Sequence, residues 1–237
     1  MSDFKDKVVM VTGAAGNLGN ATARAFLAKG AYVVLVDLDL ERLEETFADV
    51  AQDETVVFAG VDLTDDGAVE GMVYEAVQQL GAVDVLANIA GGFRSGAPVH
   101  ETSLDTWDFM LDLNARTVLI TARAVVPHML QKGTGKIISV AARPGLKAGA
   151  TSAAYAASKS AVIRLTESMS ASLKESVINV NCVIPGTLDT PQNRKAMPNA
   201  KFEKWVAPEA LADVITFLAS EKARAIHGAC VPAYGLT

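Results

Sequence analysis

The sequence contains few cysteines, few histidines and no block of basic residues, and each scarcity argues against a class of function. Among 237 residues there are two cysteines, Cys182 and Cys230, which form neither a metal-ligand spacing nor a disulfide framework. The three histidines are scattered, so we expect no metal site. A net charge of −6 without a basic block argues against a nucleic-acid partner.

Long apolar runs are also missing. No run approaches the ~18 residues of a membrane span, and the first residues, MSDFKDK, are charged rather than apolar. Together with the unpaired cysteines, this predicts a soluble, cytoplasmic protein with no membrane partner. Hydrophobic residues make up 50% of the chain, which suits one large core and a single domain over 1–237.

Short β-branched segments alternate with helical patterns along the chain. Strands are predicted over 7–12, 32–37, 56–61, 83–88, 136–140, 177–184 and 229–232. Helices are predicted from about Ala21 to the C-cap candidate Gly30, and over 41–50, 66–80, 106–130, 153–174 and 208–218. This alternation implies a Rossmann-type, doubly wound α/β domain: a mostly parallel, seven-stranded sheet with helices on both faces. Ligands bind such sheets at the carboxyl ends of the strands.

The first predicted strand ends in a glycine-rich loop, GAAGNLGNA, that opens a helix. Gly13, Gly16 and Gly19 lack Cβ atoms, so the backbone can turn tightly and approach a pyrophosphate at the positive end of that helix. Asn17 stands where a related pattern has glycine, and asparagine tolerates a left-handed backbone best among the other residues. The loop predicts dinucleotide binding; the alternative is a plain turn.

Asp37 ends the second predicted strand, where a carboxylate can accept hydrogen bonds from the adenosine ribose. It would repel a 2′-phosphate, and neither Leu38 nor residues 14–18 supply a Lys or Arg, so NAD(H) is predicted in preference to NADP(H). The alternative role for Asp37 is a helix N-cap, for which Asp39 is better placed. Asp62, followed by Leu63, is either an acceptor for the adenine amino group or a solvated turn residue.

Tyr155 and Lys159 lie four residues apart in the helix predicted over 153–174, so their side chains share one face. A fixed cation beside a phenol favours the phenolate and is expected to lower the phenol pKa from ~10, as a proton-transfer catalyst requires. The alternative is an exposed lysine near a half-buried tyrosine with no function.

These motifs together resemble the short-chain dehydrogenase/reductase family over essentially the whole chain. The segments that match are the loop 12–19, NIAG at 88–91, Asn114, Tyr155 with Lys159, and PGTLDT at 185–190. The resemblance implies that Asn114 joins Tyr155 and Lys159 in a proton relay. It also implies a homodimer or homotetramer, because the family usually pairs the helix around 153–174 between subunits. Further cofactor contacts implied in this way are Leu18, Asn88, Ala90, Gly91, Ala141, Pro185, Gly186, Leu188 and Thr190.

One position departs from the family pattern. The family's catalytic serine, which steadies the substrate oxygen, lies thirteen residues before the tyrosine, where this chain has Ala142. Ser139 is not expected to replace it, because an odd offset along a strand points a side chain to the opposite face. Losing one such donor in an acyl-transfer enzyme lowers the rate by ~10²–10³. Either activity is impaired, or the substrate does not need that donor.

Dihydropteridine reductases, a branch of the family, also lack the serine. This chain is similar to them in its Gly13/Gly16/Gly19 spacing, in AGG at 90–92 followed by the aromatic Phe93, and over 187–205. The resemblance implies an NADH-dependent reductase of a flat conjugated small molecule such as quinonoid dihydropteridine; a quinone or an unsaturated carbonyl fits nearly as well. The alternatives are a generic carbonyl/alcohol dehydrogenase and a catalytically silent NAD(H)-binding module.

The segment 187–207 has two interpretations of its own. It is predicted to be a lid that closes over the cofactor and substrate, with Met197 and Trp205 supplying apolar surface. The alternative is a solvated connector anchored by Phe202 and Trp205. The predicted substrate pocket comprises Phe93, Ala142, Met197 and Trp205; core packing is the alternative role for Phe93.

Overall fold

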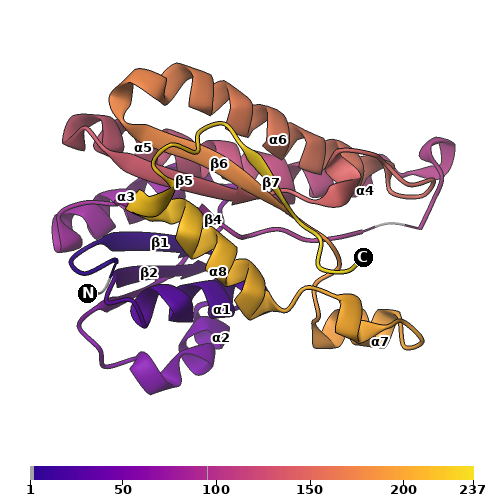
Figure 1. The fold of residues 1–237 in the computed structure, drawn as a ribbon, viewed down its shortest axis with the longest axis horizontal. Coiled ribbons are helices and arrows are strands. Elements are labelled where there is room, and N and C mark those ends of the chain that lie inside the picture. Colours follow the sequence, from indigo (N-terminus) through magenta and orange to yellow (C-terminus); the bar gives the residue numbers. More distant parts are fainter. Residues whose placement is uncertain (1–2, 95) are drawn as a thin grey trace.

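A seven-stranded, wholly parallel sheet forms the centre of the structure, a computed structural model that describes residues 3–94 and 96–237 (Figure 1). Its strands, in spatial order, are β3 (Val56–Gly60), β2 (Tyr32–Asp37), β1 (Val8–Thr12), β4 (Val85–Asn88), β5 (Gly135–Val140), β6 (Ile178–Pro185) and β7 (Cys230–Ala233). The chain runs outward from β1 to β3 and then resumes at β4 on the other side of β1. The switch in strand order, where such sheets bind ligands, therefore lies between β1 and β4.

Helices cover both faces of the sheet (Figure 1). One face carries α1 (Asn17–Leu27), α2 (Leu40–Thr46) and α8 (Pro208–Ala219). The other carries α3 (Asp66–Leu80), α4 (Leu104–Leu111), α5 (Thr117–Lys132) and α6 (Ala153–Leu173). A short helix, α7 (Pro191–Ala196), follows β6 and lies apart from both layers, beyond the carboxyl ends of the strands (Figure 1).

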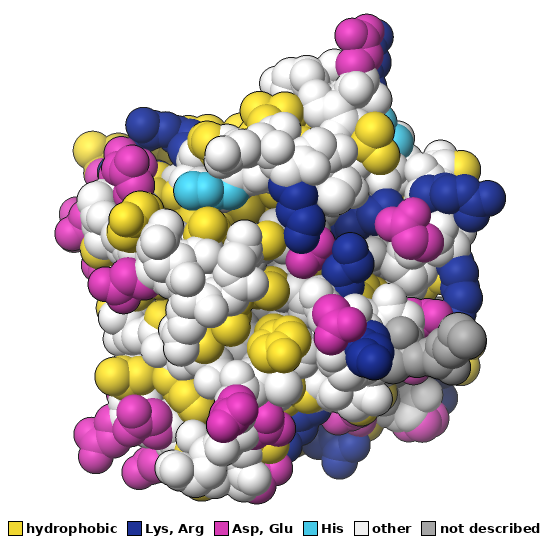
Figure 2. Space-filling view, turned by 90° about the vertical axis from the view of Figure 1, so that its left-hand side faces the viewer, with side chains coloured by type: hydrophobic (Ala, Val, Ile, Leu, Met, Phe, Trp, Pro, Cys, Tyr) yellow, Lys and Arg dark blue, Asp and Glu magenta, His cyan; other side chains and the backbone are white. Residues whose placement is uncertain are grey.

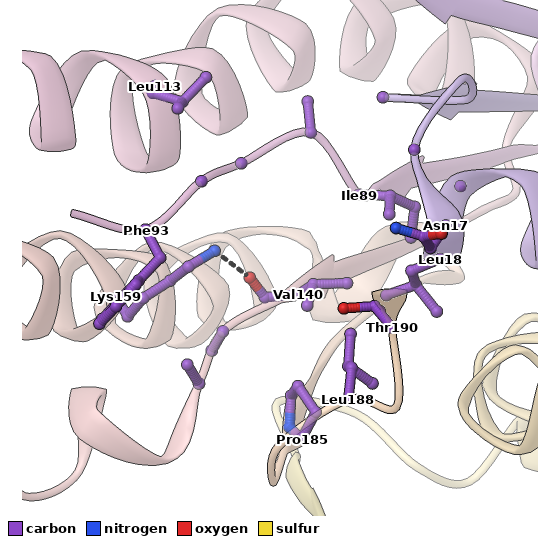
Figure 3. A pocket seen from close by; sticks show the side chains of 18 of the residues that line it. Asn17, Leu18, Ile89, Phe93, Leu113, Val140, Lys159, Pro185, Leu188 and Thr190 are labelled. Carbon is purple, nitrogen blue, oxygen red and sulfur yellow. Dashed lines mark hydrogen bonds between the residues drawn. The ribbon is translucent and has the colours of Figure 1, made fainter. Parts of the chain in front are cut away.

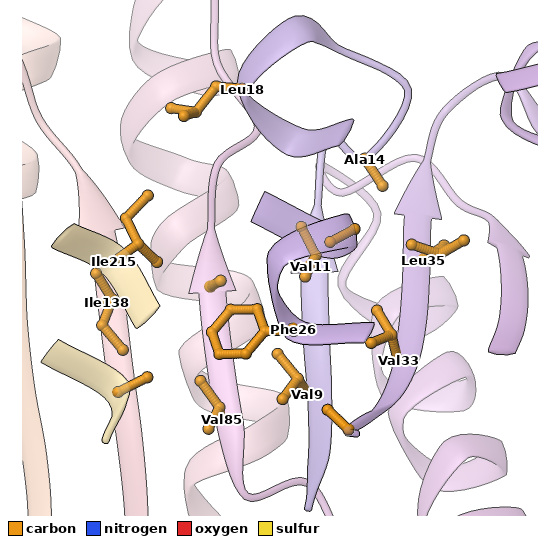
Figure 4. Close-up of a cluster of buried hydrophobic side chains, with 14 of the residues drawn as sticks. Val9, Val11, Ala14, Leu18, Phe26, Val33, Leu35, Val85, Ile138 and Ile215 are labelled. Atoms are coloured by element: carbon orange, nitrogen blue, oxygen red, sulfur yellow. The ribbon is translucent and has the colours of Figure 1, made fainter. Parts of the chain in front are cut away.

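Strand β1 shows why these residues form a sheet that is buried on both faces. Val9 and Val11 pack in one core with Phe26 of α1 and Ile215 of α8 (Figure 4). The intervening Val8 and Met10 belong to a second core on the opposite face, formed with residues of α3 and α5. A continuous apolar run is the expected signature of such a strand. Burying each large side chain contributes ~1.5–3 kcal/mol, and Phe26 is fully buried.

The predicted fold class is confirmed, and the predicted elements differ from the structure in three places. The helix predicted over 106–130 is divided into α4 and α5 by a π-helix at Asp112–Arg116. The helix predicted over 41–50 ends at Thr46, and a 3-10 turn at Ala48–Val50 completes that stretch. The stretch treated as irregular after the sixth strand contains α7. Gly30 does terminate α1, with φ 79° and with the Ala31 N–H donating to the Phe26 carbonyl.

The end of the molecule on the left of Figure 1 is seen face-on in Figure 2. Acidic and basic side chains both occur there, with hydrophobic atoms between them, and neither sign of charge covers that face alone. Within residues 3–94 and 96–237, no helix is long and apolar enough to cross a membrane. The same residues contain no group of three or more His, Cys, Asp or Glu arranged to hold a metal ion.

Candidate active site

A cavity of about 930 Å³ opens at the carboxyl ends of the strands and spans the switch between β1 and β4. All but three of the residues predicted to form a site line it. Those that do are Gly13, Gly16, Asn17, Leu18, Gly19, Asp37, Asp62, Leu63, Ala90, Gly91, Phe93, Ala141, Ala142, Tyr155, Lys159, Pro185, Gly186, Leu188, Thr190 and Met197. The three that do not are Asn88, Asn114 and Trp205.

The glycine loop closes one end of the cavity. Gly13 has φ 66°, and a Cβ placed on it would lie 2.8 Å from the Ala90 Cα, so a larger residue would push β1 and β4 apart. Helix α1 begins at Asn17, and its N-cap, Gly16, has no side chain to satisfy the first N–H groups. These donors remain available for an anion at the positive end of the helix. Asn17 itself is helical, so its expected tolerance of a left-handed backbone is not used.

Asp37 lies at the end of β2, as predicted, and a basic side chain lies near it. Its carboxylate accepts hydrogen bonds from the Ala15 N–H and the Leu38 N–H, both at 2.9 Å. Asp39 caps α2 by accepting from the Arg42 N–H, so Asp37 is not that cap. The Arg42 guanidinium also lines the cavity and donates to the Ala15 carbonyl at 3.2 Å. The adenosine end therefore holds a positive group that the sequence analysis did not consider.

Asp62 has the predicted turn role and also lines the cavity, while its predicted contact with adenine stays a prediction. One carboxylate oxygen accepts from the Thr64 N–H at 2.9 Å and from the Thr64 hydroxyl at 2.7 Å, which is a turn-forming arrangement. These two hydrogen bonds hold the pKa of the Asp62 carboxyl below its usual value. The residue also lines the cavity, so its other oxygen remains available to a ligand.

Tyr155 and Lys159 project from the first turns of α6 into the middle of the cavity. The Phe93 ring meets the Tyr155 ring edge-on, with 4.8 Å between the ring centroids. The Lys159 Nζ donates to the Val140 carbonyl at 2.8 Å (Figure 3). Phe93 is 62% exposed, so it is a wall of the cavity and not a core residue.

Burial controls the protonation of this pair, in the direction opposite to that expected from sequence. It raises the pKa of Tyr155 to about 12 and lowers the pKa of Lys159 to about 8. The expectation of a lowered phenol pKa is wrong for this structure, because loss of water outweighs any attraction between the two groups. Tyr155 is consequently a neutral phenol throughout the physiological pH range.

Asn114 lies in the π-helix, and its side chain is hydrogen-bonded to the loop that follows β4. Its amide donates to the Gly92 carbonyl at 3.1 Å and to the Ser158 hydroxyl at 3.2 Å, while its oxygen accepts from the Gly92 N–H at 3.1 Å. A Cβ placed on Gly91 would lie 2.7 Å from the Asn114 Oδ1 and 3.2 Å from the Lys159 Nζ. The amide, the lysine and this loop therefore form one packed unit. π-helical turns occur frequently at functional sites.

The segment after β6 forms a loop that is closed at its base. The Val206 N–H donates to the Thr187 carbonyl and the Asp189 N–H to the Val206 carbonyl, at 2.9 and 2.8 Å. Within the loop, Thr190 caps α7, and the Asn17 amide of the glycine loop donates to Gln192 at 2.9 Å.

The aromatic residues of this loop lie outside the cavity. Trp205 packs against Phe202 with ring centroids 4.8 Å apart, which matches the anchoring role of the alternative interpretation and not the predicted pocket role. Arg194 forms an ion pair with Asp189 and lies over the Phe202 ring. Met197, by contrast, faces the cavity.

Comparison with known proteins decides the family. The family model described as short chain dehydrogenase matches residues 7–201. The chain is 34% identical to 2-(R)-hydroxypropyl-CoM dehydrogenase of Xanthobacter autotrophicus (strain ATCC BAA-1158 / Py2), over 95% of this chain and 96% of that protein. The chain belongs to the short-chain dehydrogenase family.

Two further proteins are similar to this chain over nearly its whole length. Meso-2,3-butanediol dehydrogenase of Serratia marcescens is 35% identical, over 98% of this chain and 94% of that protein. The crystal structure of carveol dehydrogenase from Mycobacterium avium in complex with NAD superposes with a TM-score of 0.90 at 27% identity, covering 99% of this chain and 98% of that one. The resemblance predicted at family level is confirmed, and the family is one of oxidoreductases that use nicotinamide cofactors.

Ser139 does not stand in for the serine that the family has at position 142. Ala142 is buried and lines the cavity. Ser139 is fully buried beneath it, where its hydroxyl accepts from the Asn88 amide at 3.4 Å. Neither Ser139 nor Asn88 lines the cavity, and the two side chains are hydrogen-bonded partners.

Four residues near the site of the short-chain dehydrogenase were not singled out by the sequence analysis: Arg42, Arg143, Lys147 and Ser158. For two of them a signal was present. The N-cap at Asp39 places Arg42 in the first turn of the helix that follows the second strand, and Arg143 directly follows Ala142. Lys147 and Ser158 carry no comparable signal, because only the folded loop and helix bring them to the site.

Proposed function

We propose that this chain is an NAD(H)-dependent oxidoreductase in which Tyr155 exchanges a proton with the substrate. The observation that carries the proposal is the meeting, in one cavity at the sheet switch point, of the glycine loop with Tyr155 and Lys159. A module that only binds a dinucleotide has no need for the second set of residues. Two relatives, 2-(R)-hydroxypropyl-CoM dehydrogenase and meso-2,3-butanediol dehydrogenase, are dehydrogenases, which supports an enzyme.

The residues present fit a nicotinamide dinucleotide. The uncapped start of α1 offers N–H donors to a pyrophosphate, and Gly13 leaves space that a Cβ would fill. Asp37 offers a carboxylate to the adenosine ribose and supports a preference for NAD(H). Arg42 opposes that preference, because it could offset the charge of a 2′-phosphate. The cofactor, when bound, supplies or accepts the hydride.

Side chains of this protein supply the proton for the reaction and determine the shape of the site. Tyr155 holds its proton at neutral pH and is therefore prepared to donate it, which supports the reductive direction. Lys159 is directed by the Val140 carbonyl toward the loop after β4. Asn114 fixes that loop through two hydrogen bonds to Gly92 and joins it to α6 through a third, to Ser158. Phe93 covers the phenol and reduces its access to water.

For the acceptor we propose a flat conjugated molecule, with quinonoid dihydropteridine as the leading candidate. Hydride arrival at such a ring restores conjugation, so little localised oxyanion forms and the Ala142 methyl group leaves no donor missing. The exposed Phe93 ring offers a flat apolar surface beside Tyr155. A second candidate is a secondary alcohol or ketone, which the names of the butanediol and hydroxypropyl-CoM relatives favour.

The decisive experiment is a turnover screen with NADH against quinonoid dihydrobiopterin, a quinone and a simple ketone. Tyr155→Phe, which removes only the donated proton, is expected to retain NADH binding while kcat falls by ~10² or more. Undiminished turnover in this variant would remove Tyr155 from the reaction. If the parent protein reduced none of the three acceptors, a non-catalytic NAD(H)-binding module would become the better interpretation.

We also propose two properties that concern the whole molecule. The segment 187–206 acts as a lid, because it places Met197 at the cavity and Gln192 on the glycine loop. The protein forms a homodimer or homotetramer, because large apolar side chains of α4 and α5 are exposed; these are Leu104, Trp107, Phe109 and Leu119. Light scattering on the purified protein measures the assembly directly.

A further inference from the structure

The stretch 113–166 contains no Asp or Glu, although the chain as a whole is acidic. Its basic residues therefore need partners elsewhere, and most have them. The ion pairs are Arg116–Asp112, Arg123–Asp66, Lys132–Asp84, Lys136–Glu221 and Arg164–Glu167. Three cations of the stretch, Arg143, Lys147 and Lys159, form no ion pair with any carboxylate in the described part of the chain.

All three of these cations line the cavity. Lys159 already has a role beside Tyr155, which leaves the charges of Arg143 and Lys147 without one. The only carboxylate side chains in the lining are Asp37 and Asp62, at the ends of β2 and β3. Arg143 and Lys147 follow β5, three strands from β2, so at ~4.8 Å per strand the two groups are separated by about 14 Å. Cations without a side-chain carboxylate therefore lie at the end of the cavity beside Arg143, whereas the end beside β2 and β3 has two carboxylates together with Arg42.

Arg143 is held in place next to the reacting position. It directly follows Ala142, and its guanidinium lies over the Tyr234 ring, 5.1 Å from the ring centroid. The 3-10 turn Arg143–Gly145 packs directly on α6, since a Cβ on Gly145 would lie 2.8 Å from the Lys159 carbonyl carbon. A cation fixed in this way loses less freedom on binding a ligand than an unrestrained surface side chain does.

We propose that Arg143 and Lys147 form a subsite for a carboxylate carried by the substrate. The guanidinium fork matches the two oxygens of a carboxylate, and the lysine adds a second positive charge at the rim. The subsite rests on the proposed function, because it names the substrate class of the same active site: a flat or carbonyl-bearing acceptor with a carboxylate a short distance from the reacting carbon. Quinonoid dihydropteridine carries no carboxylate, so a confirmed subsite would count against it as the acceptor. It would select this acid over a neutral analogue of the same shape.

The test compares 4-acetylbenzoate with its methyl ester, which differ in charge and share the conjugated ketone. Calorimetry with and without saturating NAD⁺ measures binding alone, because a ketone and NAD⁺ cannot react. We expect the acid to bind at least tenfold more tightly than the ester, and added salt to weaken only the acid. Arg143→Met should weaken acid binding by about fivefold, the upper end for an exposed ion pair, because the Arg143 side chain is itself exposed. Lys147→Met should weaken it by up to about fivefold, as for an exposed ion pair.

Lys174→Met, which removes an exposed lysine at the far end of α6, is the matched control and should bind the acid like the parent. Arg143→Lys keeps the charge without the fork and should fall between the parent and Arg143→Met. Equal binding of acid and ester, or an acid affinity that Arg143→Met does not change, would overturn the subsite. Arg143-dependent acid binding without turnover of any acceptor would leave the subsite standing and count against the proposed function alone.

Discussion

Replacing Lys159 with methionine is expected to stabilise the protein near neutral pH while abolishing its activity. The lysine side chain is 5% exposed, and burial lowers its pKa from an ordinary 10.5 to about 8. Below pH 8 Lys159 is therefore charged while it is buried in the folded state. This charge costs free energy relative to the unfolded chain, where water solvates it. Methionine retains the apolar stem of the side chain without that charge.

The magnitude follows from the pKa difference. At 1.36 kcal/mol per unit, a buried Lys159 charge destabilises the folded parent by about 3 kcal/mol at pH 7. The hydrogen bond to the Val140 carbonyl offsets about 1 kcal/mol of this, so the variant should gain about 2 kcal/mol. The unfolded state binds more protons than the folded state between about pH 8 and 10.5, so the parent recovers stability as pH rises through that window. By pH 9.5 the penalty falls to about 1.4 kcal/mol, and the two proteins should be nearly equal.

Urea unfolding of both proteins at pH 7 and pH 9.5 measures this difference, because groups that titrate identically in both cancel. Lys174→Met, at an exposed position, is the control, and its stability relative to the parent should not change with pH. A Lys159→Met effect of the same size at both pH values would refute the buried charge. A variant less stable than the parent at pH 7 would show that Lys159 contributes more through its contacts than it loses by burial.

Four other substitutions test separate parts of the site. Asp37→Ala should bring the NADH and NADPH dissociation constants closer together, because it removes a repulsive charge while Arg42 remains. Arg42→Leu should weaken the binding of NADPH more than that of NADH. Equal dissociation constants in the parent would contradict the proposed preference. Ala142→Ser should raise kcat/KM for a ketone and leave that for a quinonoid pterin unchanged or lower, whereas a parent that already prefers the ketone would exclude the conjugated acceptor. Gly91→Ala should lower kcat at least tenfold and destabilise by ~1–3 kcal/mol, because its Cβ would meet Asn114 and Lys159. Its control, Gly71→Ala in α3, meets nothing within 4 Å and should be neutral or stabilising.

Local sequence patterns were sufficient for the sheet and for most of the cavity lining. The helix predicted over 66–80 agrees with α3 at both ends, because Asp65 caps it and Gly81 ends it in a left-handed conformation. Val8 to Thr12 are all buried, as a continuous β-branched run predicts. Gly13, Asp37 and Tyr155 reach one cavity because parallel strands deliver their carboxyl ends to the same edge.

The features that sequence reasoning missed depend on tertiary packing. The π-helix around Asn114 lies within the stretch that was predicted as one continuous helix, because its residue types are as helical as those on either side. Tyr155 and Lys159 were placed correctly, but the direction of their pKa shifts depends on how much water the surrounding chain excludes. Trp205 was assigned to the pocket on its residue type, whereas its partner, Phe202, turns it away from the cavity.

The closed base of the 187–206 loop has a consequence for how this protein can diversify. The backbone bridge between Leu188 and Val206 holds the two ends of the loop together independently of what lies between them. Insertions or replacements within the loop therefore need not disturb β6 or α8, and lengthening it costs only a slowly growing closure entropy. The loop can therefore be exchanged as a unit, and the substrate range can change with it. The glycine loop, Tyr155 and Lys159 stay in place, because the sheet and α6 hold them.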